Sequence, residues 1–266
     1  MKALKLKTLF VALASAMTFS SCLGDSEVTD YPHYSTYVTV KGDSFFGYTF
    51  YADFGGTLIP TLQSIKEVVP GLVNSDVKRM YISFDLVPES DNGKTLQAGA
   101  TYNIALKSSY GSNIAIPTYS TVDTYGNQAA IDSLTTKNEP INTISNRIWA
   151  ANGYLNTSMT IDYDYSKPFY MHTYYNPEED INFDEKTLHL NLYYNSNSTY
   201  TDQQGSSVFS FELPQYAASQ FLMNGFSSND SINLVLRAVT DHTLQLTEIT
   251  QCKMAIEDFY QPGSIF

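Results

Sequence analysis

Cysteine is scarce in this sequence, since its 266 residues include only two, Cys22 and Cys252. So few cysteines cannot build a disulfide framework within one chain. Basic residues are scarce too, at 15 Lys and Arg against 27 Asp and Glu. Without residues 1–21, which contain three lysines, 12 basic residues face 27 acidic ones, a net charge of −15. Because nucleic-acid binding needs clustered Lys and Arg, we expect no nucleic-acid partner.

Catalytic and cofactor motifs are absent as well. The sequence contains no G-x-S-x-G, no H-E-x-x-H, no phosphate loop and no dinucleotide fingerprint. We therefore expect a protein that is not an enzyme and uses no cofactor. One alternative stays open, because Asp162 and Asp164 lie two residues apart on a predicted strand and paired carboxylates can hydrolyse glycosides. Carboxylates at this spacing are more often simply solvated, so a glycan hydrolase ranks last.

Metal-ligand patterns are weak. The best of them places Asp180, Asn182 and Asp184 at alternate positions, as in the first half of an EF-hand loop. Glu185 stands where that loop requires glycine, and Asn191 stands where it requires a bidentate glutamate. A solvated hairpin loop is the better interpretation, and we expect no metal site.

The N-terminal apolar stretch is too short to span a membrane. Residues 8–19 carry no charge, but these 12 residues fall short of the roughly 20 that a transmembrane helix needs. Three lysines precede the stretch, and Phe19-Ser20-Ser21-Cys22 ends it with small residues. This order is typical of an export leader, and we predict a signal peptide over residues 1–21.

Ser20-Ser21-Cys22 resembles a Bacteroidetes lipobox, in which the cysteine thiol takes a diacylglycerol and becomes the mature N-terminus. Acyl chains would then hold the protein in a membrane. Residues 22–33 are polar and aperiodic, which predicts a lipidated tether. Asp25 and Glu27 resemble a surface-export signal, so we expect an outer-membrane lipoprotein on the periplasmic or cell-surface side. An ordinary secretion signal with an incidental cysteine is the alternative.

The mature chain shows the period of β-strands. Tyrosine occurs 21 times and phenylalanine 15 times, a composition that favours strands. Apolar and polar residues alternate at 34–40, 46–50, 78–87 and 102–106. These runs predict an OB-like small β-barrel over residues 34–138.

A second all-β domain is predicted over residues 139–266. Residues 126–146 lack a sustained period, so the domain boundary is placed there. Alternating runs follow at 154–165, 169–175, 187–194, 208–213, 231–239 and 244–256, which predicts a β-sandwich, with one short helix over 214–224. Cys252 shares a strand face with Met254 and Ile256, so it is predicted to be a core residue rather than a reactive thiol.

Five segments carry a family resemblance: YADFGGTLIP (51–60), DVKRMYISFDL (76–86), RIWAANGYLNTSMTIDY (147–163), TLHLNLYYN (187–195) and VFSFEL (208–213). Together they resemble the NigD-like lipoproteins of Bacteroidetes over nearly the whole mature chain. The resemblance implies an OB-like barrel followed by an immunoglobulin-like β-sandwich. Where relatives more often end one strand with charged, histidine-containing residues, this chain has Tyr193-Tyr194-Asn195. The family takes its name from a bacteriocin locus, which makes a bacteriocin-immunity or inhibitor function an alternative.

A candidate ligand surface lies on the hairpin predicted over 169–175 and 187–194. Pairing residue 171 with 190 would place His172 opposite His189 and turn one face outward. That face would consist of Tyr170, His172, Tyr174, His189, Asn191 and Tyr193. Tyrosines on a rigid sheet suit a glycan or a protein ligand. The alternative is that tyrosine simply makes good strand surface here.

Two short sequons and one basic dipeptide complete the candidates. Ser133 and Ser231 each follow an aspartate and precede an apolar residue, which resembles the Bacteroidetes O-glycosylation sequon. Lys78-Arg79, the strongest basic cluster of the barrel, is interpreted as strand-edge charge. We expect, in sum, a lipid-anchored, non-catalytic binding or interaction protein of the cell envelope, whose partners are the membrane at Cys22 and an unidentified glycan or protein.

Overall fold

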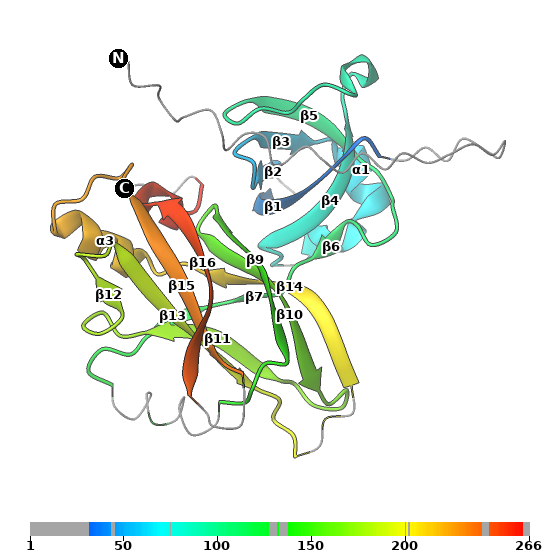
Figure 1. Cartoon of the computed structure of the whole chain (residues 1–266). Coiled ribbons are helices and arrows are strands. Elements are labelled where there is room, and N and C mark those ends of the chain that lie inside the picture. The colour runs from blue at the N-terminus through cyan, green and yellow to red at the C-terminus, as the bar shows by residue number, and fades with distance from the viewer. Residues whose placement is uncertain are drawn as a thin grey trace, which may run out of the picture.

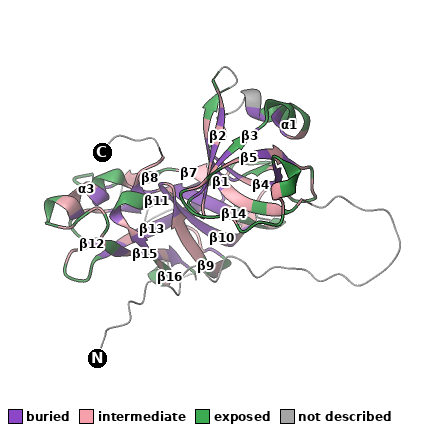
Figure 2. Cartoon of the chain, turned by 90° about the horizontal axis from the view of Figure 1, so that it is seen from above, coloured by how far each residue is buried: buried purple, intermediate pink, exposed green. Residues whose placement is uncertain are grey.

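The computed structural model describes residues 32–43, 46–74, 76–127, 132, 138–199, 201, 203–240 and 245–262. Cys22 and Ser133 lie outside these residues, as does nearly all of the predicted tether. The described chain forms a small barrel followed by a larger sandwich of two sheets, and the two meet along one side (Figure 1). Figure 2 shows the buried residues on the strands of both parts.

The barrel consists of β1 (Tyr34–Asp43), β2 (Gly47–Ala52), β3 (Thr57–Pro60), β4 (Arg79–Leu86) and β5 (Thr101–Leu106). β1 pairs with both β2 and β4, which closes the sheet in the order β1-β2-β3-β5-β4. β3 and β5 run parallel, whereas β4 and β5 run antiparallel. A closed five-stranded barrel with a helix between β3 and β4 confirms the OB-like prediction.

Alternating residues of these strands fill the barrel core, as the period-2 pattern predicts. Val38, Phe50, Leu58, Ile82 and Ile104 are all 0% exposed. Each such side chain contributes about 1.5–3 kcal/mol to folding relative to an exposed position. The short strand β6 (Ile114–Ala115) pairs with β4 outside this core.

Helix α1 (Leu62–Val68) and the 3-10 turns η2 (Pro70–Asn74) and η3 (Glu89–Asp91) complete the barrel. Thr61 caps α1, because its Oγ1 accepts a hydrogen bond from Ser64 N at 3.3 Å. Ile65 is 1% exposed and packs into the barrel core. The strand pattern does not predict α1, since seven residues are too few to show a sustained helical period.

The chain enters the sandwich through β7 (Thr118–Tyr119) and β8 (Thr121–Asp123). β7 pairs with one sheet and β8 with the other, so this short segment joins both sheets. The two sheets are also linked by a hydrogen bond at this segment, because Thr121 Oγ1 of β8 donates to the backbone oxygen of Glu212, the last residue of β14, at 2.5 Å. The sandwich strands therefore begin at Thr118, ahead of the boundary expected at residue 138.

The remaining elements are β9 (Thr143–Ala151), β10 (Tyr154–Tyr163), β11 (Tyr170–Tyr175), β12 (Ile181–Asn182), β13 (Thr187–Asn195), β14 (Gln203–Glu212), α3 (Gln215–Met223), β15 (Ser231–Val239), β16 (Leu246–Ala255) and η4 (Ile256–Phe259). One sheet has the order β7-β14-β10-β9 and the other β16-β15-β13-β11-β8. This arrangement confirms the predicted sandwich, and α3 confirms the predicted helix. None of the described helices is long and apolar enough to cross a membrane.

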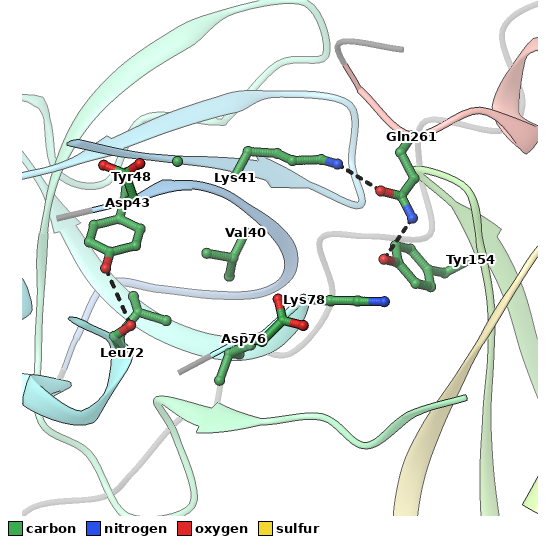
Figure 3. A pocket seen from close by; sticks show the side chains of 11 residues that line it. Val40, Lys41, Asp43, Tyr48, Leu72, Asp76, Lys78, Tyr154 and Gln261 are labelled. Atoms are coloured by element: carbon green, nitrogen blue, oxygen red, sulfur yellow. Dashed lines mark hydrogen bonds between the residues drawn. The ribbon is translucent and has the colours of Figure 1, made fainter. Parts of the chain in front are cut away.

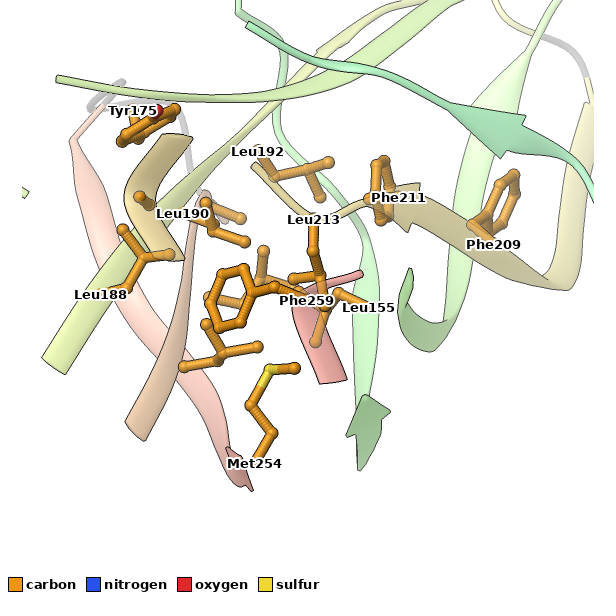
Figure 4. Packing of buried hydrophobic residues seen from close by; sticks show 14 of the residues in the cluster. Leu155, Tyr175, Leu188, Leu190, Leu192, Phe209, Phe211, Leu213, Met254 and Phe259 are labelled. Carbon is orange, nitrogen blue, oxygen red and sulfur yellow. The ribbon is translucent and has the colours of Figure 1, made fainter. Parts of the chain in front are cut away.

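The sandwich core lies between the two sheets (Figure 4). Leu188, Leu190 and Leu192 of β13 face Leu155 of β10 and Phe211 of β14, and all five are at most 1% exposed. Cys252 packs at the edge of this cluster. Burial raises the pKa of the Cys252 thiol to about 11, so the thiol stays protonated, as expected for a core residue.

Candidate functional site

The predicted ligand face of β11 and β13 is mostly buried. Of its residues only Tyr170 is open, with 55% of its surface exposed. Tyr174, Asn191 and Tyr193 are only 6%, 5% and 7% exposed. The prediction of an exposed aromatic face is therefore wrong, although all six residues do share the side of the sheet that faces away from the main core.

The predicted register of this hairpin is also wrong. Met171 pairs with Tyr194 instead of residue 190, and His172 lies opposite Tyr193 instead of His189. The shift is four residues, an even number, so the inward-facing residues were assigned to the correct side. The long connection between β11 and β13, which contains β12, leaves the register unrestrained by a tight turn.

The connection after β11 runs beside β13, with which β12 pairs, and brings the Asp180 side chain to this side of the sheet. Asp180 is 6% exposed and accepts hydrogen bonds from Asn191 Nδ2 at 3.0 Å and Arg237 Nη1 at 3.1 Å. Burial raises the pKa of the Asp180 carboxyl despite these donors. Tyr193 stacks on His172 with ring centroids 4.6 Å apart. Asp180 is thus buried and hydrogen bonded, so the expectation of a solvated loop is wrong at this residue.

The candidate hydrolytic pair does not form a catalytic arrangement. Asp164 accepts hydrogen bonds from Ser166 N at 2.8 Å and Ser198 Oγ at 2.9 Å, and these donors hold the pKa of its carboxyl low. Asp162 accepts one from Gln204 at 3.2 Å. A glycosidase acid needs a raised pKa, whereas the pKa of Asp164 is lowered. Within the described residues, no three His, Cys, Asp or Glu side chains gather closely enough to hold a metal ion.

The second glycosylation candidate is accessible. Ser231 is exposed at the start of β15. The preceding Asp230 accepts a hydrogen bond from Ser227 N at 2.8 Å, which helps to lower the pKa of its carboxyl. Modification of Ser231 stays a prediction.

A buried ion pair lies where the barrel meets the sandwich. Arg79 is 0% exposed, and its Nη1 and Nη2 each donate to one carboxylate oxygen of Asp53 at 2.7 Å. Nη1 also donates to Thr39 Oγ1 at 3.0 Å. The strand-edge interpretation is therefore wrong for Arg79. Lys78, in contrast, is half exposed and pairs with Glu212 of the sandwich at 2.8 Å.

Side chains of the sandwich complete this ion pair, which we call the junction network. Trp149 Nε1 donates to Asp53 Oδ2 at 2.8 Å, and Asn152 Nδ2 donates to Asp53 Oδ1 at 3.3 Å. Arg79 Nη2 donates to Asn156 Oδ1 at 2.9 Å. The ion pair itself lies within the barrel, but separating the domains would break the three hydrogen bonds that Trp149, Asn152 and Asn156 make with it. The junction network therefore fixes the barrel on the sandwich.

Aromatic rings cover one side of the junction network. The ring centroid of Tyr37 lies 4.8 Å from that of Tyr81 and 5.1 Å from that of Trp149. The guanidinium of Arg147 lies 5.7 Å from the Trp149 ring centroid. Burial is the main reason that the pKa of Tyr37 is raised. These rings keep water from the ion pair and strengthen it.

An open cleft of about 320 Å³ lies between the two domains (Figure 3). Its lining residues are Val40, Lys41, Gly42, Asp43, Tyr48, Leu72, Asp76, Val77, Lys78, Tyr154 and Gln261. Lys41 Nζ donates to Gln261 Oε1 at 2.7 Å, and Gln261 Nε2 donates to Tyr154 Oη at 2.8 Å. This chain of hydrogen bonds links the barrel, the C-terminal segment and β10.

Gly153 lets the C-terminal segment approach the cleft. Its φ is +81°, and a Cβ at this position would lie 2.8 Å from Gln261 Cγ and 3.0 Å from Gln261 N. Both the backbone angle and the contact require glycine. The cleft wall formed by Gln261 thus depends on Gly153.

Alternation does not reveal the junction network, but the family segments do contain it. Asp53 lies in YADFGGTLIP and Arg79 in DVKRMYISFDL, while Trp149, Asn152 and Asn156 lie in RIWAANGYLNTSMTIDY. The strand period carries no signal for it, because Arg79 and Asn156 each lie on the face of their strand opposite the apolar residues.

Residues 123–250 match the model of the NigD-like C-terminal beta sandwich domain. The chain thus contains a domain of the NigD-like family. No curated protein sequence matches this NigD-like chain.

Solved structures share the two-part fold of this NigD-like chain. A protein of Parabacteroides distasonis, provisionally named toxin-related, is 16% identical with a TM-score of 0.58, over 85% of this chain and 94% of its own. A provisionally named lipoprotein of Bacteroides fragilis is 12% identical with a TM-score of 0.55, over 86% and 99%. A NigD-like immunity protein of Bacteroides caccae is 18% identical with a TM-score of 0.52, over 84% and 97%. At these identities the likeness concerns the fold.

Proposed function

We propose that this NigD-like chain is a lipid-anchored, non-catalytic binding protein of the cell envelope. The observation that carries the proposal is the cleft, since the junction network fixes two domains that both contribute to its walls. Junctions between domains are common positions for ligand sites. Of the two carboxylates considered for hydrolysis, Asp164 is hydrogen bonded to Ser166 and Ser198 and has a lowered pKa, which favours binding over turnover.

The N-terminal sequence supports the lipid anchor. A leader ending in Ser20-Ser21-Cys22 fits export followed by acylation. The provisional name of the Bacteroides fragilis neighbour points in the same direction. An outer-membrane position, facing the periplasm or the cell surface, is the finer part of this proposal.

Fractionation of cells tests the anchor. The Cys22→Ala variant should move from the membrane to the soluble fraction, because the acyl chains would be its attachment. Cys252→Ala is the matched control and should stay with the membrane. If the Cys22→Ala chain is retained in membranes with its leader removed, the lipid anchor is refuted. Protease treatment of intact cells then separates the cell-surface from the periplasmic side.

Capture of a partner tests the binding function. The full-length chain, cross-linked in intact cells and purified in detergent, should recover a specific envelope glycan or protein without converting it. Gly153→Ala should reduce the yield, because it displaces Gln261 from the cleft wall. Gly225→Ala, which has a similar φ of +89° and open space around its Cβ, controls for backbone strain. Equal recovery by the two variants would contradict a role for the cleft.

A bacteriocin-immunity or inhibitor function is the second candidate. It is favoured by the name of the Bacteroides caccae neighbour, a NigD-like immunity protein. Deletion of the gene should then sensitise the cells to a particular toxin, and the Cys22→Ala chain should restore resistance poorly. Unchanged sensitivity across a panel of toxins from related bacteria would remove this candidate.

A further inference from the structure

We propose that the cleft binds a small zwitterion, a short peptide with a free ammonium and a free carboxylate group. The inference rests on the proposed binding function and names the ligand class of that site. The linked side chains of Lys41, Gln261 and Tyr154 lie in one part of the cleft, and the Asp76 carboxylate lies in another (Figure 3). A ligand with opposite charges at its two ends satisfies both parts at once.

The donor part consists of Lys41, Gln261 and Tyr154. The Lys41 ammonium has three N–H donors, and among the described residues its hydrogen bond goes to Gln261 Oε1. The Gln261 amide has two N–H donors, one of which it gives to Tyr154 Oη. Because Tyr154 Oη accepts this bond, the O–H group of Tyr154 is still able to donate a hydrogen bond. This part of the cleft is suited to bind a carboxylate.

The acceptor part is the exposed carboxylate of Asp76. The carboxylate of Asp43 lies elsewhere on the cleft wall and accepts a hydrogen bond from Phe46 N at 2.9 Å. Lys78 lies beside Asp76, but its ammonium already pairs with Glu212 at 2.8 Å. Glu212 therefore offsets the charge of Lys78, and the carboxylate of Asp76 can attract a ligand ammonium. Together Lys41 and Asp76 set the polarity of the cleft.

Size and ring exposure favour a peptide over a sugar. The cleft volume of about 320 Å³ lies at the small end of ligand pockets. Tyr48 and Tyr154 are 7% and 1% exposed, so their ring faces are covered. Stacking on an open aromatic ring, which is a common way to hold a sugar, is therefore not offered by these tyrosines.

Calorimetric titration of the full-length chain in detergent tests this assignment. The probe is alanyl-alanine with free termini, and the comparison probe is the same dipeptide with an N-acetyl and a C-terminal amide group. We expect saturable binding of the free dipeptide and none of the blocked one. Lys41→Met and Asp76→Asn should each weaken binding about tenfold or more, since each removes one charged hydrogen bond.

Lys66→Met is the matched control, because Lys66 is an exposed lysine of α1 away from the cleft. Near-UV circular dichroism checks that each variant is folded. Equal binding of the two probes, unchanged affinity in both cleft variants, or no binding to the unmodified chain overturns the zwitterion assignment. Capture of a partner in cells together with no dipeptide binding would overturn this inference and leave the proposed binding function standing. Neither result bears on the lipid anchor, which fractionation tests separately.

Discussion

Trp149 donates its indole N–H to Asp53 Oδ2 at 2.8 Å, across the contact between sandwich and barrel. Trp149 is also the single tryptophan of the chain, so its fluorescence reports on the junction network alone. We expect urea to change the tryptophan fluorescence and the far-UV circular dichroism in one coincident transition, because the two domains share this buried network. A fluorescence change that precedes the loss of strand signal would show that the domains separate before they unfold.

Removal of Arg79 should be strongly destabilising. Arg79→Met leaves the Asp53 carboxylate at the junction without its ion pair, so we expect a loss of about 3–5 kcal/mol in the free energy of unfolding. Lys78→Met is the neighbouring control, and its half-exposed pair with Glu212 should contribute less than about 1 kcal/mol. Denaturant titration of both variants gives the comparison. Similar losses in the two would mean that the Arg79 pair is no stronger than a surface salt bridge.

Tyr193 and Tyr170 should differ sharply although both lie on the face once expected to bind ligand. Tyr193 is 7% exposed and stacks on His172, so Tyr193→Ala should cost about 3–5 kcal/mol, as for other buried aromatic residues. Tyr170 is 55% exposed, and Tyr170→Ala should cost about 0.5 kcal/mol or less. Thermal unfolding measures both. A loss of stability for Tyr193→Ala as small as that for Tyr170→Ala would contradict the burial of Tyr193 and support an open face.

Asp180 should make stability depend on pH in the direction opposite to a surface aspartate. Burial raises its pKa above the ordinary 3.8, so the folded chain binds this proton more tightly than the unfolded chain. Its contribution to stability is therefore complete below about pH 3.8 and is lost as the pH rises through the raised pKa. Relative to Asp180→Asn, the unmodified chain should become less stable across this range.

Asp164 provides the control of opposite sign. Its hydrogen bonds lower its pKa, so its contribution is present above the ordinary value of 3.8 and is lost as the pH falls through the lowered pKa. Free energies of unfolding measured from acidic to neutral pH separate the two cases. The chains to compare are the unmodified one, Asp180→Asn and Asp164→Asn. A parallel pH dependence for the two variants would contradict the burial effect at Asp180.

The alternation of apolar and polar residues predicted strands well where one face of a strand is buried and the other is more exposed, as on β2. Val38 and Ile82 are core residues for this reason, and the even register shift on β11 kept Met171 inward. The pattern failed on β11 and β13, where residues of the outer face are buried as well. Nothing in the local sequence around Tyr193 signals that Tyr174 and Val122 pack against it, or that Asp180 bonds to Asn191 on the same side of the sheet.

The junction network shows a different limit. Arg79 alternates with apolar residues in β4 and so was assigned to the solvent side, as most arginines would be. Arg79 pairs with Asp53 inside the barrel, and Asn156 and Trp149 reach this pair only where the sandwich contacts the barrel. Such pairing is a property of the tertiary structure, so the period of one strand cannot report it.

The way β1 is held has a mechanical consequence. β1 is hydrogen bonded to β2 on one edge and to β4 on the other, both antiparallel. If the chain is tethered at Cys22, a pulling force enters the fold at Tyr34 and runs along the axis of β1. The backbone hydrogen bonds on both edges then bear the force together in shear, instead of opening one after another like a zipper. Drag on a captured partner would thus be resisted by the strand next to the tether.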